Sequence, residues 1–359
     1  MGHMTNKCPL YDGFSLPDRG QWQNWGLVYD KFCNVWSKKS DKWSLGDNKK
    51  KWLEGFARIV GNRDLIEDMS SRLQRLVEAR GGNIIFVRTA GRFVTGMGNE
   101  NPAENGFAWH PTLGTPYMPG SSVKGMLRAW MQEWVTSDPR QINAIFGSAN
   151  KNSDSSAGNV MFYDALPLSP IKLTLDVMTP HYADYYRGDA PPGDWQSPVP
   201  IPFLTVDSDQ QFMFAIAPRT RDGDQYMDLL EQEIYQAIEI VGAGAKTAVG
   251  YGRFIIDAAQ KSQYVDERTK REEVLLKQRE IAELSPVQRE MEADGYGDDQ
   301  VFINKVDAWL DRAEKAEVSE RQEIAEALRD WYQRYRKGMF DNPNKKNRPR
   351  VERLKKLLR

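Results

Sequence analysis

Apolar side chains recur at helical spacing in three parts of the chain. A leader over residues 5–80 reads as helical, and its last stretch carries apolar residues three and four apart until a glycine pair at 81–82 interrupts the pattern. The same spacing predicts a helix over 121–135 and an amphipathic helix over 223–241. These helices flank a part of the chain with a different periodicity.

Runs rich in Val, Ile, Phe and Thr lie between these helices and predict strands. They cover residues 83–88, 91–95, 160–165, 171–178, 202–207, 211–217 and 253–256. A Pro- and Tyr-rich excursion over 179–200 separates two of them. Because helices and strands alternate within 83–257, we predict an α+β fold with a ferredoxin-like layer rather than an all-parallel sheet.

From residue 258 onward the pattern is helical again. Ser285 and Gln288 predict a capping box at a helix start, and Ser319 and Gln322 predict a second one. Apolar stripes are formed by Phe302, Val306, Trp309, Ala313 and Ala316, and by Ile324, Leu328, Trp331 and Tyr335. Amphipathic helices need a surface to cover, so we expect this extension to dock on the core or on a partner.

Five of the eleven tryptophans lie in the leader, at Trp22, Trp25, Trp36, Trp43 and Trp52. We expect them to pack against the next domain rather than to stack on bases. The first residues resemble an expression tag. We therefore divide the chain into a tag scar with a Trp-rich helical leader (1–82), a core (83–257), and a helical extension with a basic C-terminal tail (258–359).

The composition excludes several classes of protein. The two cysteines, Cys8 and Cys33, are too few for a disulfide framework or a Cys-rich zinc module. Outside the tag the histidines are His110 and His181, in unrelated contexts, so we predict no metal site and no cofactor. No apolar run reaches the roughly 20 residues of a membrane helix. We expect a soluble, cytoplasmic protein with no membrane partner.

The net charge of −1 conceals a strong asymmetry. Residues 336–359 hold ten Lys and Arg against two Asp and Glu. This basic tail has two interpretations that the sequence does not separate. It could neutralise RNA phosphates without reading sequence, or it could be a solvated or partner-docking helix end.

The first candidate site is the start of the helix near residue 121. Ser121 is a good N-cap, and Lys124 falls in the first helical turn, where a cation opposes the helix dipole. That placement makes sense if an anion such as phosphate binds the helix N-terminus. Arg128 follows four residues later on the same face. An ordinary exposed helix start explains these residues equally well.

The second candidate site is a loop over 242–252, which has four glycines among its eleven residues. Such a loop exposes backbone N–H groups that bind anions. It is not a Walker A motif, because Ile240 and Ala245 stand where glycines are required, and Thr247 replaces the third glycine of the dinucleotide fingerprint. A sugar-phosphate backbone with a base stacked on Tyr251 suits the loop better than nucleotide hydrolysis or hydride transfer.

Together the two segments resemble the RAMP superfamily of CRISPR RNA-binding proteins. The resemblance rests on Pro-Gly-Ser-Ser-Val-Lys-Gly at 119–125 and on the loop at 242–254, which is similar to the superfamily's C-terminal glycine-rich loop. Within the superfamily, residues 175–186 and 197–204 most resemble the sixth-subunit family of the type III-B Cmr effector. The similarity spans roughly residues 84–256.

The resemblance implies an RRM-like, ferredoxin-like RAMP core and a non-catalytic RNA-binding role. The chain would be a scaffold subunit that caps the backbone filament of an RNA-guided complex near the 3′ end of the guide (CRISPR) RNA and supports recognition of target RNA in antiviral defence. Its partners would be the guide, its paired target RNA and other RAMP subunits, with no small-molecule substrate.

Site residues follow from the motifs and the resemblance together. The candidate RNA-binding residues are Ser121, Ser122, Lys124, Arg128, Gly242, Gly244, Lys246, Thr247, Tyr251 and Arg253. The excursion over 179–200 would be a thumb-like hairpin that wedges into the guide–target duplex, with Met178, His181 and Tyr182 as candidate contacts.

Some RAMP relatives cleave RNA, so a metal-independent endoribonuclease for guide processing or target cleavage stays open as the alternative. Its acid–base candidates would be Asp176, His181 and Asp184, with His110 more remote. Such cleavage needs a base near the 2′-OH and a donor for the leaving oxygen, within reach of each other. No spacing in the sequence establishes that pair, and we prefer the scaffold.

Overall fold

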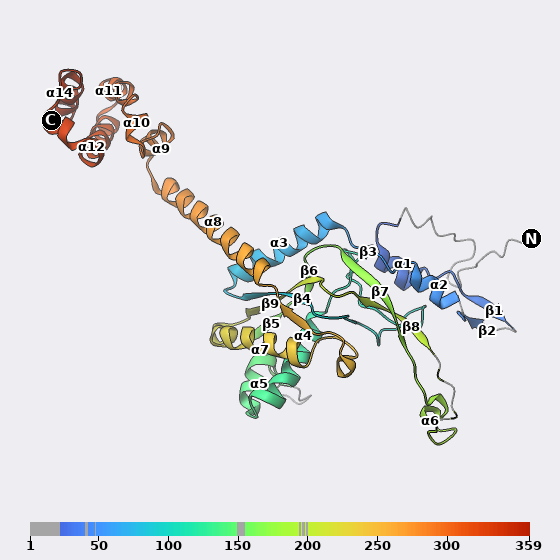
Figure 1. Ribbon diagram of the computed structural model, residues 1–359. Helices are drawn as coiled ribbons and strands as arrows, with labels where there is room; N and C mark the ends of the chain where they lie inside the picture. Colours follow the sequence, from blue (N-terminus) through green and yellow to red (C-terminus); the bar gives the residue numbers. More distant parts are fainter. Residues whose placement is uncertain are drawn as a thin grey trace, which may run out of the picture. The chain divides into compact units, whose positions relative to one another are not determined.

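The computed structural model describes residues 22–39, 42–46, 48–148, 155–193, 195, 198 and 200–359. The chain divides into two compact units, of which the first ends at Ser262 and the second spans Gln263–Arg359 (Figure 1). Among the described residues, no helix has the length and apolar character needed to cross a membrane.

The first unit is built on a five-stranded antiparallel sheet, ordered β10-β4-β9-β5 with β6 beside β9. The strands are β4 (Asn83–Thr89), β5 (Val160–Phe162), β6 (Leu166–Pro167), β9 (Gln211–Pro218) and β10 (Phe254–Ile256). Helix α4 (Gly120–Trp130) follows β4, and α7 (Met227–Ile240) connects β9 to β10. This βαββαβ connectivity confirms the ferredoxin-like prediction.

The two faces of this sheet carry alternate residues of each strand. Ile85 and Phe214 belong to the core shared with α4 and α7. Met213 points to the other face, where Gln74 of α3 (Arg63–Ala79) donates a hydrogen bond to its sulfur at 3.8 Å. Figure 1 shows α3 and α7 on opposite sides of the sheet. Both faces are therefore covered, which explains why β4 and β9 are buried along most of their length.

The predicted helix over 121–135 changes its hydrogen-bonding pattern part-way along. It is α-helical as α4 up to Trp130 and then continues as a π-helical turn, η2 (Met131–Val135), before α5 (Pro139–Phe146). The predicted helix over 223–241 is similarly divided between a 3₁₀ turn, η3 (Arg221–Tyr226), and α7.

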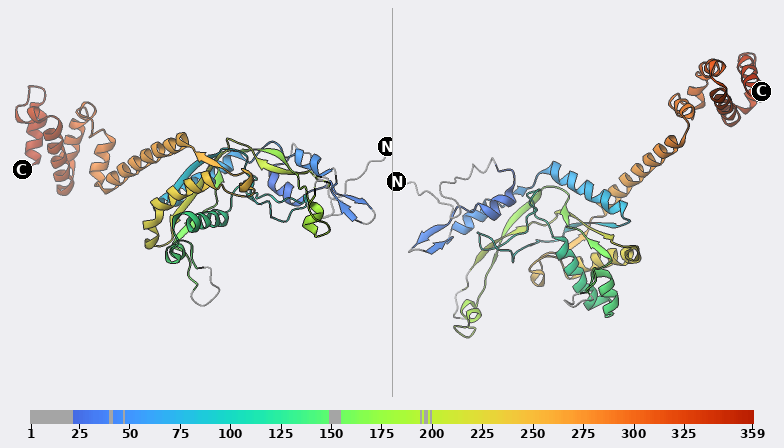
Figure 2. Two further views of the ribbon diagram at one scale, coloured as in Figure 1. Left: turned by 60° about the horizontal axis from the view of Figure 1, so that its bottom comes forward. Right: turned by 180° about the vertical axis from the view of Figure 1, so that it is seen from behind.

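A long hairpin extends from the first unit (Figure 2). It is formed by β7 (Ile171–Met178) and β8 (Ile201–Val206), and β7 also pairs with β3 (Ile59–Val60). The register places Asp176 opposite Phe203 and Met178 opposite Ile201. The excursion between the two strands carries a short helix, α6 (Ala183–Arg187).

The leader is less helical than its apolar spacing predicts. It contains α1 (Trp25–Lys31) and α2 (Asn48–Glu54) ahead of α3, and also a hairpin of β1 (Ser37–Lys39) and β2 (Lys42–Ser44) that the sequence did not predict.

Most of the leader tryptophans pack inside the first unit, as predicted. The rings of Trp25 and Trp52 lie 5.7 and 5.0 Å from the ring of Phe56, and Tyr29 contacts Trp109 of the loop that precedes α4. Trp43 is the exception, because it stays partly exposed on β2. The aromatic cluster thus joins the leader to the core rather than forming a stacking surface.

The second unit is a set of short helices with its own apolar core. Helix α8 (Ala258–Glu283) runs across the division between the units, and α9 (Pro286–Ala293), α10 (Asp299–Phe302), α11 (Val306–Lys315), α12 (Val318–Tyr335), α13 (Lys337–Asp341) and α14 (Arg348–Leu357) follow it. Trp309, Leu328, Trp331 and Leu354 are among its buried residues.

Two expectations for this extension need correction. The capping box at Ser285 is confirmed, but the one at Ser319 is wrong, because α12 begins at Val318 after Glu317. The two predicted amphipathic helices cover each other and α14, so their stripes need neither the first unit nor a partner.

Candidate functional site

The two sequence motifs meet at one groove of about 440 Å³ in the first unit. One wall is α4 with the π-helical turn, another is the glycine-rich loop, and the segment 95–98 lies between them. The lining residues are Thr95, Gly96, Met97, Gly98, Met118, Ser122, Met126, Ala129, Trp130, Glu133, Trp134, Val241, Gly242, Gly244, Ala245 and Thr247. The predicted site residues Ser122, Gly242, Gly244 and Thr247 therefore face one space.

The glycine-rich loop requires glycine where it approaches the chain next to it. Gly244 has a φ of +85°, and a Cβ added there would lie 2.2 Å from the carbonyl oxygen of Val94. This close approach lets Ala245 donate from its backbone N–H to the Val94 carbonyl at 2.8 Å, while Gly252 donates to the Arg92 carbonyl at 2.8 Å. The loop is thus fixed against the edge of the core instead of hanging free.

The same loop offers unpaired backbone donors. Within the described part of the chain, the N–H groups of Gly244, Lys246, Thr247 and Ala248 donate no backbone hydrogen bond. Lys246 has a left-handed backbone with a φ of 60°, and the 3₁₀ turn η4 (Thr247–Val249) follows it. Successive N–H groups in such a turn form a nest for an anion. The loop can therefore bind phosphate without a cationic side chain in the groove.

The start of α4 differs from the prediction. The helix begins at Gly120 after Pro119, so Ser121 is exposed and is not the N-cap. The backbone N–H of Gly120 donates to Oδ1 of Asp164 at 2.6 Å. Asp164 thus supplies the negative charge that favours a helix N-terminus, and the argument for a phosphate at this point loses its force.

Lys124 and Arg128 do not line the groove. On a helix of 3.6 residues per turn they lie on a different flank from Ser122 and Met126, which do line it. Both cations are half-buried on that flank. The structure therefore separates the two cations of the first motif from its groove-lining serine.

Lys246 and Tyr251 of the glycine loop face the middle of the β7–β8 ladder. The ammonium of Lys246 lies 5.3 Å from the ring centre of Phe203, and the Tyr251 ring lies 5.9 Å from the same ring. The Tyr251 hydroxyl donates to the carboxylate of Asp176 at 2.5 Å, and Arg92 donates to that carboxylate as well. Tyr251 is thus engaged within the chain, which makes it a poorer stacking partner than the sequence suggested.

This network shifts two pKa values. Partial burial acts to raise the pKa of Asp176, but the hydrogen bonds from Tyr251 and Arg92 outweigh it and hold that pKa below its ordinary value. Burial, followed by the bond to Asp176, raises the pKa of Tyr251 to about 12. At neutral pH the pair is a carboxylate and a neutral phenol, so it joins the loop to the hairpin through a charge-assisted hydrogen bond.

Arg253 also acts inside the loop. Its Nη1 atom is buried and has no hydrogen-bond partner among the described residues. A Cβ added to Gly242 would lie 2.5 Å from this atom, so the guanidinium packs against the loop backbone. Gly242 also has a φ of +85°, and a Cβ there would lie 2.9 Å from the carbonyl oxygen of Gly252, so the loop backbone requires glycine at this position.

A profile of the RAMP superfamily matches residues 86–255. The match begins within β4, ends within β10, and contains both walls of the groove. Residues 86–255 form a RAMP superfamily domain.

Curated relatives of the chain share one name. A protein named CRISPR system Cmr subunit Cmr6 from Pyrococcus furiosus is 30% identical over 228 residues, which cover 47% of this chain and 66% of the relative. A Cmr6 subunit from Saccharolobus solfataricus is 30% identical over 155 residues, covering 42% and 48%. The matched segment thus spans about two thirds and about half of the length of these relatives.

Solved structures also align with part of the chain. A structure described as the type III-B Cmr-beta bound to cognate target RNA is 23% identical, with a TM-score of 0.46, and covers 58% of this chain and 71% of the other. The crystal structure of Cmr6 from Pyrococcus furiosus is 26% identical, with a TM-score of 0.31, and covers 49% and 97%.

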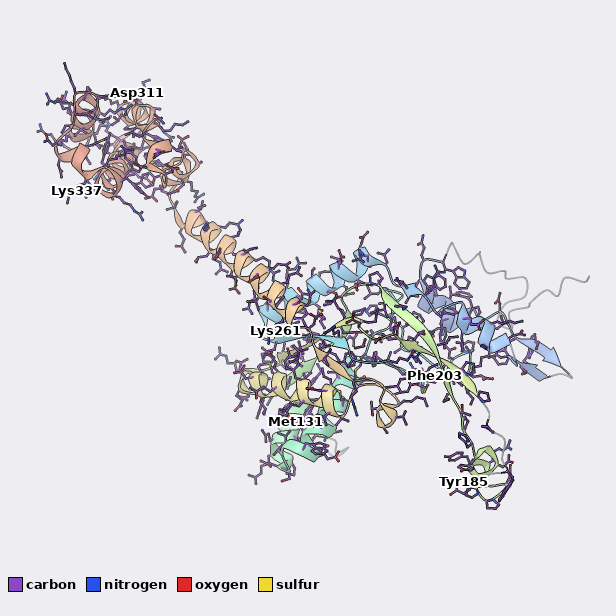
Figure 3. The ribbon with its side chains drawn as sticks, in the orientation of Figure 1. Met131, Tyr185, Phe203, Lys261, Asp311 and Lys337 are labelled. Atoms are coloured by element: carbon purple, nitrogen blue, oxygen red, sulfur yellow. The ribbon has the colours of Figure 1, made fainter. Side chains whose placement is uncertain are left out.

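The hairpin of the RAMP domain carries the predicted thumb residues away from the groove. Met178 ends β7, His181 is exposed beyond it, and Tyr182 stands just before α6. None of the three lines the groove. Figure 3 labels Tyr185 of α6 near the end of the hairpin, and its neighbour Tyr186 is 75% exposed.

The candidate acid–base residues of the RAMP domain are not assembled around a common point. Asp176 is engaged by Tyr251 and Arg92, whereas Asp184 pairs with Arg187 on α6. The His110 ring accepts a hydrogen bond from the backbone N–H of Leu113 at 3.3 Å, and burial lowers its pKa. Among the described residues, no hydrogen bond or ion pair joins any two of these four candidates, so they do not form the hydrogen-bonded acid–base pair that metal-free cleavage needs.

Sequence reasoning missed several lining residues of the groove, chiefly Met97, Met126, Glu133 and Trp134. The spacing of four residues between Trp130 and Trp134 was the available signal, but two tryptophans at helical spacing ordinarily indicate a buried face. Asp164 was missed as well, because it reaches Gly120 from a segment 44 residues away.

Proposed function

We propose that this chain is a non-catalytic, RNA-binding scaffold subunit of a type III-B CRISPR (Cmr) effector. In this role it caps the backbone filament near the 3′ end of the guide RNA and supports recognition of the target RNA in the cytoplasm. The observation that carries the proposal is the single groove built from α4 and the glycine-rich loop of the RAMP domain. The relatives named Cmr6 support the choice of effector.

The groove suits a sugar-phosphate backbone for a physical reason. Its loop presents unpaired N–H groups, and such groups bind phosphate oxygens whatever the base. A subunit that must accept any guide sequence needs contacts of this kind. The guide would follow the loop, and the other RAMP subunits would bind next to it.

The hairpin supplies the second part of the proposal. Its excursion presents exposed aromatic side chains at Tyr185, Tyr186 and Trp195. Aromatic faces stack on bases without reading them. We expect this hairpin, with Met178, His181 and Tyr182, to wedge into the guide–target duplex.

The scaffold role is favoured over the endoribonuclease by the state of Asp176. Its pKa lies below the ordinary value, and its oxygens already accept hydrogen bonds from Tyr251 and Arg92. A carboxylate held in this way is a weak base, because proton uptake would break bonds that it already makes. Cleavage of target RNA that is lost in an Asp176→Asn or a His181→Ala variant of the assembled effector would overturn the scaffold proposal.

A charge placed in the groove tests the RNA-binding role. Thr247→Glu puts a carboxylate beside the unpaired N–H groups, so we expect the affinity for single-stranded RNA to fall at least about tenfold, from like-charge repulsion and from a competing anion in the nest. Fluorescence anisotropy with a labelled RNA measures this, and the melting temperature checks that the fold is intact.

Val249→Glu is the matched control. Val249 is 71% exposed in the same turn and does not line the groove, so the variant has the same net charge and a similar effect on the loop. We expect its affinity to stay within about threefold of the unmodified chain, because a solvent-exposed charge outside the groove interacts only weakly. Equal losses in the two variants would contradict a role for the groove.

A further inference from the structure

Trp134 is an exposed tryptophan on the wall of the groove. Its side chain is 61% exposed, although the neighbouring Trp130 is only 5% exposed. The apolar side chains of Met97 and Met126 also line the groove. An indole left open beside apolar neighbours is the kind of surface that a flat ligand covers.

The backbone places Trp134 there through an unusual turn. It lies in the π-helical turn η2 (Met131–Val135), which continues α4, and Figure 3 labels Met131 at the start of this turn. Single π-helical turns within α-helices are rare and occur often at functional sites. The wider turn carries Trp134 to the groove while Met131 stays buried.

Trp134 is also held in a fixed orientation. Its ring lies parallel to the ring of Trp130, with ring centres 5.6 Å apart and an angle of 18° between the planes. The indole Nε1–H of Trp130 donates to Oε2 of the buried Glu233 at 2.6 Å, which anchors the Trp130 ring. Stacking occupies one face of Trp134 and leaves the opposite face for a ligand, so little conformational entropy is lost on binding.

The charges around the groove determine the orientation in which a nucleotide fits. Glu133 is the one charged side chain among the lining residues, and it is next to Trp134. A phosphate is repelled from this side, whereas the opposite wall is the glycine-rich loop with its unpaired N–H groups. A nucleotide therefore fits with its phosphate on the loop and its base toward Trp134.

We propose that Trp134 is the platform on which one unpaired base of the bound RNA stacks. The base, Trp134 and Trp130 then form one continuous stack. The size of the groove, about 440 Å³, suits a ligand of this class. This inference rests on the proposed RNA-binding role of the groove and adds the part of the RNA that it recognises. The site is tolerant of sequence, because every base has a π-face.

The test compares Trp134→Leu with Trp134→Phe in the full chain. Stacking on an aromatic side chain is worth about tenfold or more in affinity, so we expect Trp134→Leu to weaken binding of a short single-stranded RNA by at least that factor. Trp134→Phe should retain most of the affinity of the unmodified chain. The dependence of affinity on salt should be the same in all three chains, because no phosphate contact is removed.

An RNA of the same length without bases separates stacking from a structural role. The unmodified chain should bind this abasic RNA at least about tenfold more weakly than the normal RNA, whereas Trp134→Leu should bind both alike. Trp43→Leu is the matched control, since Trp43 is 43% exposed on β2 and does not line the groove. Its affinities should equal those of the unmodified chain.

The outcomes distinguish failure of this inference from failure of the proposed function. If Trp134→Leu retains full affinity, or loses the same factor on abasic RNA as on normal RNA, while Thr247→Glu loses affinity, the groove binds RNA but Trp134 does not stack on it. If the Thr247 and Trp134 variants all bind like the unmodified chain, the groove itself is not the RNA site, and both proposals fall.

Discussion

The glycine-rich loop and the basic C-terminal segment differ in the groups that they offer to an anion. The groove beside the loop is lined by no Lys or Arg, and Gly244 and Thr247 of the loop line it with backbone N–H groups that donate no backbone hydrogen bond within the described residues. Residues 336–359 hold ten Lys and Arg, yet part of that charge stabilises the second unit from within. The density of positive charge along the sequence is therefore a poor guide to where an anion binds in this protein.

Ion pairs account for three of the ten basic residues. Arg336 pairs with Asp299 at 2.7 Å, Arg350 with Asp307 at 2.9 Å, and Arg353 with Glu314 at 2.7 Å. The hydrogen bond from Arg350 is the main cause that holds the pKa of Asp307 below its ordinary value, and Arg353 does the same for Glu314. The pairs of Arg350 and Arg353 fix one flank of α14 against α11, whereas Arg336 joins the end of α12 to α10.

The same helix contributes to the apolar core of the second unit. Val351 and Leu354 are buried against α11 and α12, between the paired arginines. The other seven basic residues, Lys337, Lys345, Lys346, Arg348, Lys355, Lys356 and Arg359, are exposed and make no ion pair with the described residues. The basic tail is therefore a folded element with a structural flank and a solvent-facing flank.

The largest expected effect breaks this folded element. Leu354→Ala removes a fully buried side chain, so we expect the free energy of unfolding of the second unit to fall by about 3 kcal/mol. Because the two units have separate cores, denaturant unfolding should show the shift in one transition and leave the transition of the RAMP domain in place. Lys356→Ala, on the exposed side of α14, should change stability by less than about 0.5 kcal/mol. A shift in both transitions would show that the units unfold together.

Charge neutralisation on the solvent-facing flank has a smaller effect, on binding. Exposed cations attract phosphate without reading sequence, so Lys345→Gln, Lys346→Gln and Arg348→Gln together should lower the slope of log affinity against log salt for single-stranded RNA by about 2. Arg353→Gln is the contrasting variant, because its charge is already paired. It should lower stability and leave the slope unchanged. Equal slopes in all chains would leave this flank without a role in RNA binding.

Much of the fold could be predicted from the sequence because its periodicities are local. The order of strands and helices in the RAMP domain follows from alternating runs between amphipathic segments, and these placed β4, α4, β9 and α7 correctly. The glycine-rich loop was found for a related reason. Only glycine fits where residue 244 approaches the Val94 carbonyl, so this requirement of the fold is visible in the sequence as a glycine.

The errors arose where a distant residue or a change of helix type decides the outcome. Ser121 looks like an N-cap, but Asp164 from another segment satisfies Gly120 and the helix begins one residue earlier. Trp134 reads as one more buried aromatic until the π-helical turn moves it outward. In the basic tail the spacing of Val351 and Leu354 was visible, yet the surrounding charge obscured the apolar stripe.

The smallest effect concerns the contact between the glycine-rich loop and the hairpin. Tyr251→Phe removes the hydroxyl that donates to Asp176 and keeps the ring beside Phe203, so we expect the RAMP domain to lose about 1 kcal/mol of stability at pH 7. The pKa of Asp176 is lowered in the folded chain, so this stabilisation is present above the ordinary value of 3.8 and is lost as the pH falls through the lower folded value. Denaturant unfolding at several pH values should therefore show a difference between the chains that is full at pH 7 and shrinks in acid.

Tyr186→Phe, at an exposed position on α6, controls for the loss of a phenol and should show no such difference. A Tyr251→Phe chain as stable as the unmodified one at every pH would mean that the loop is held by its glycine contacts alone, with no help from the hairpin.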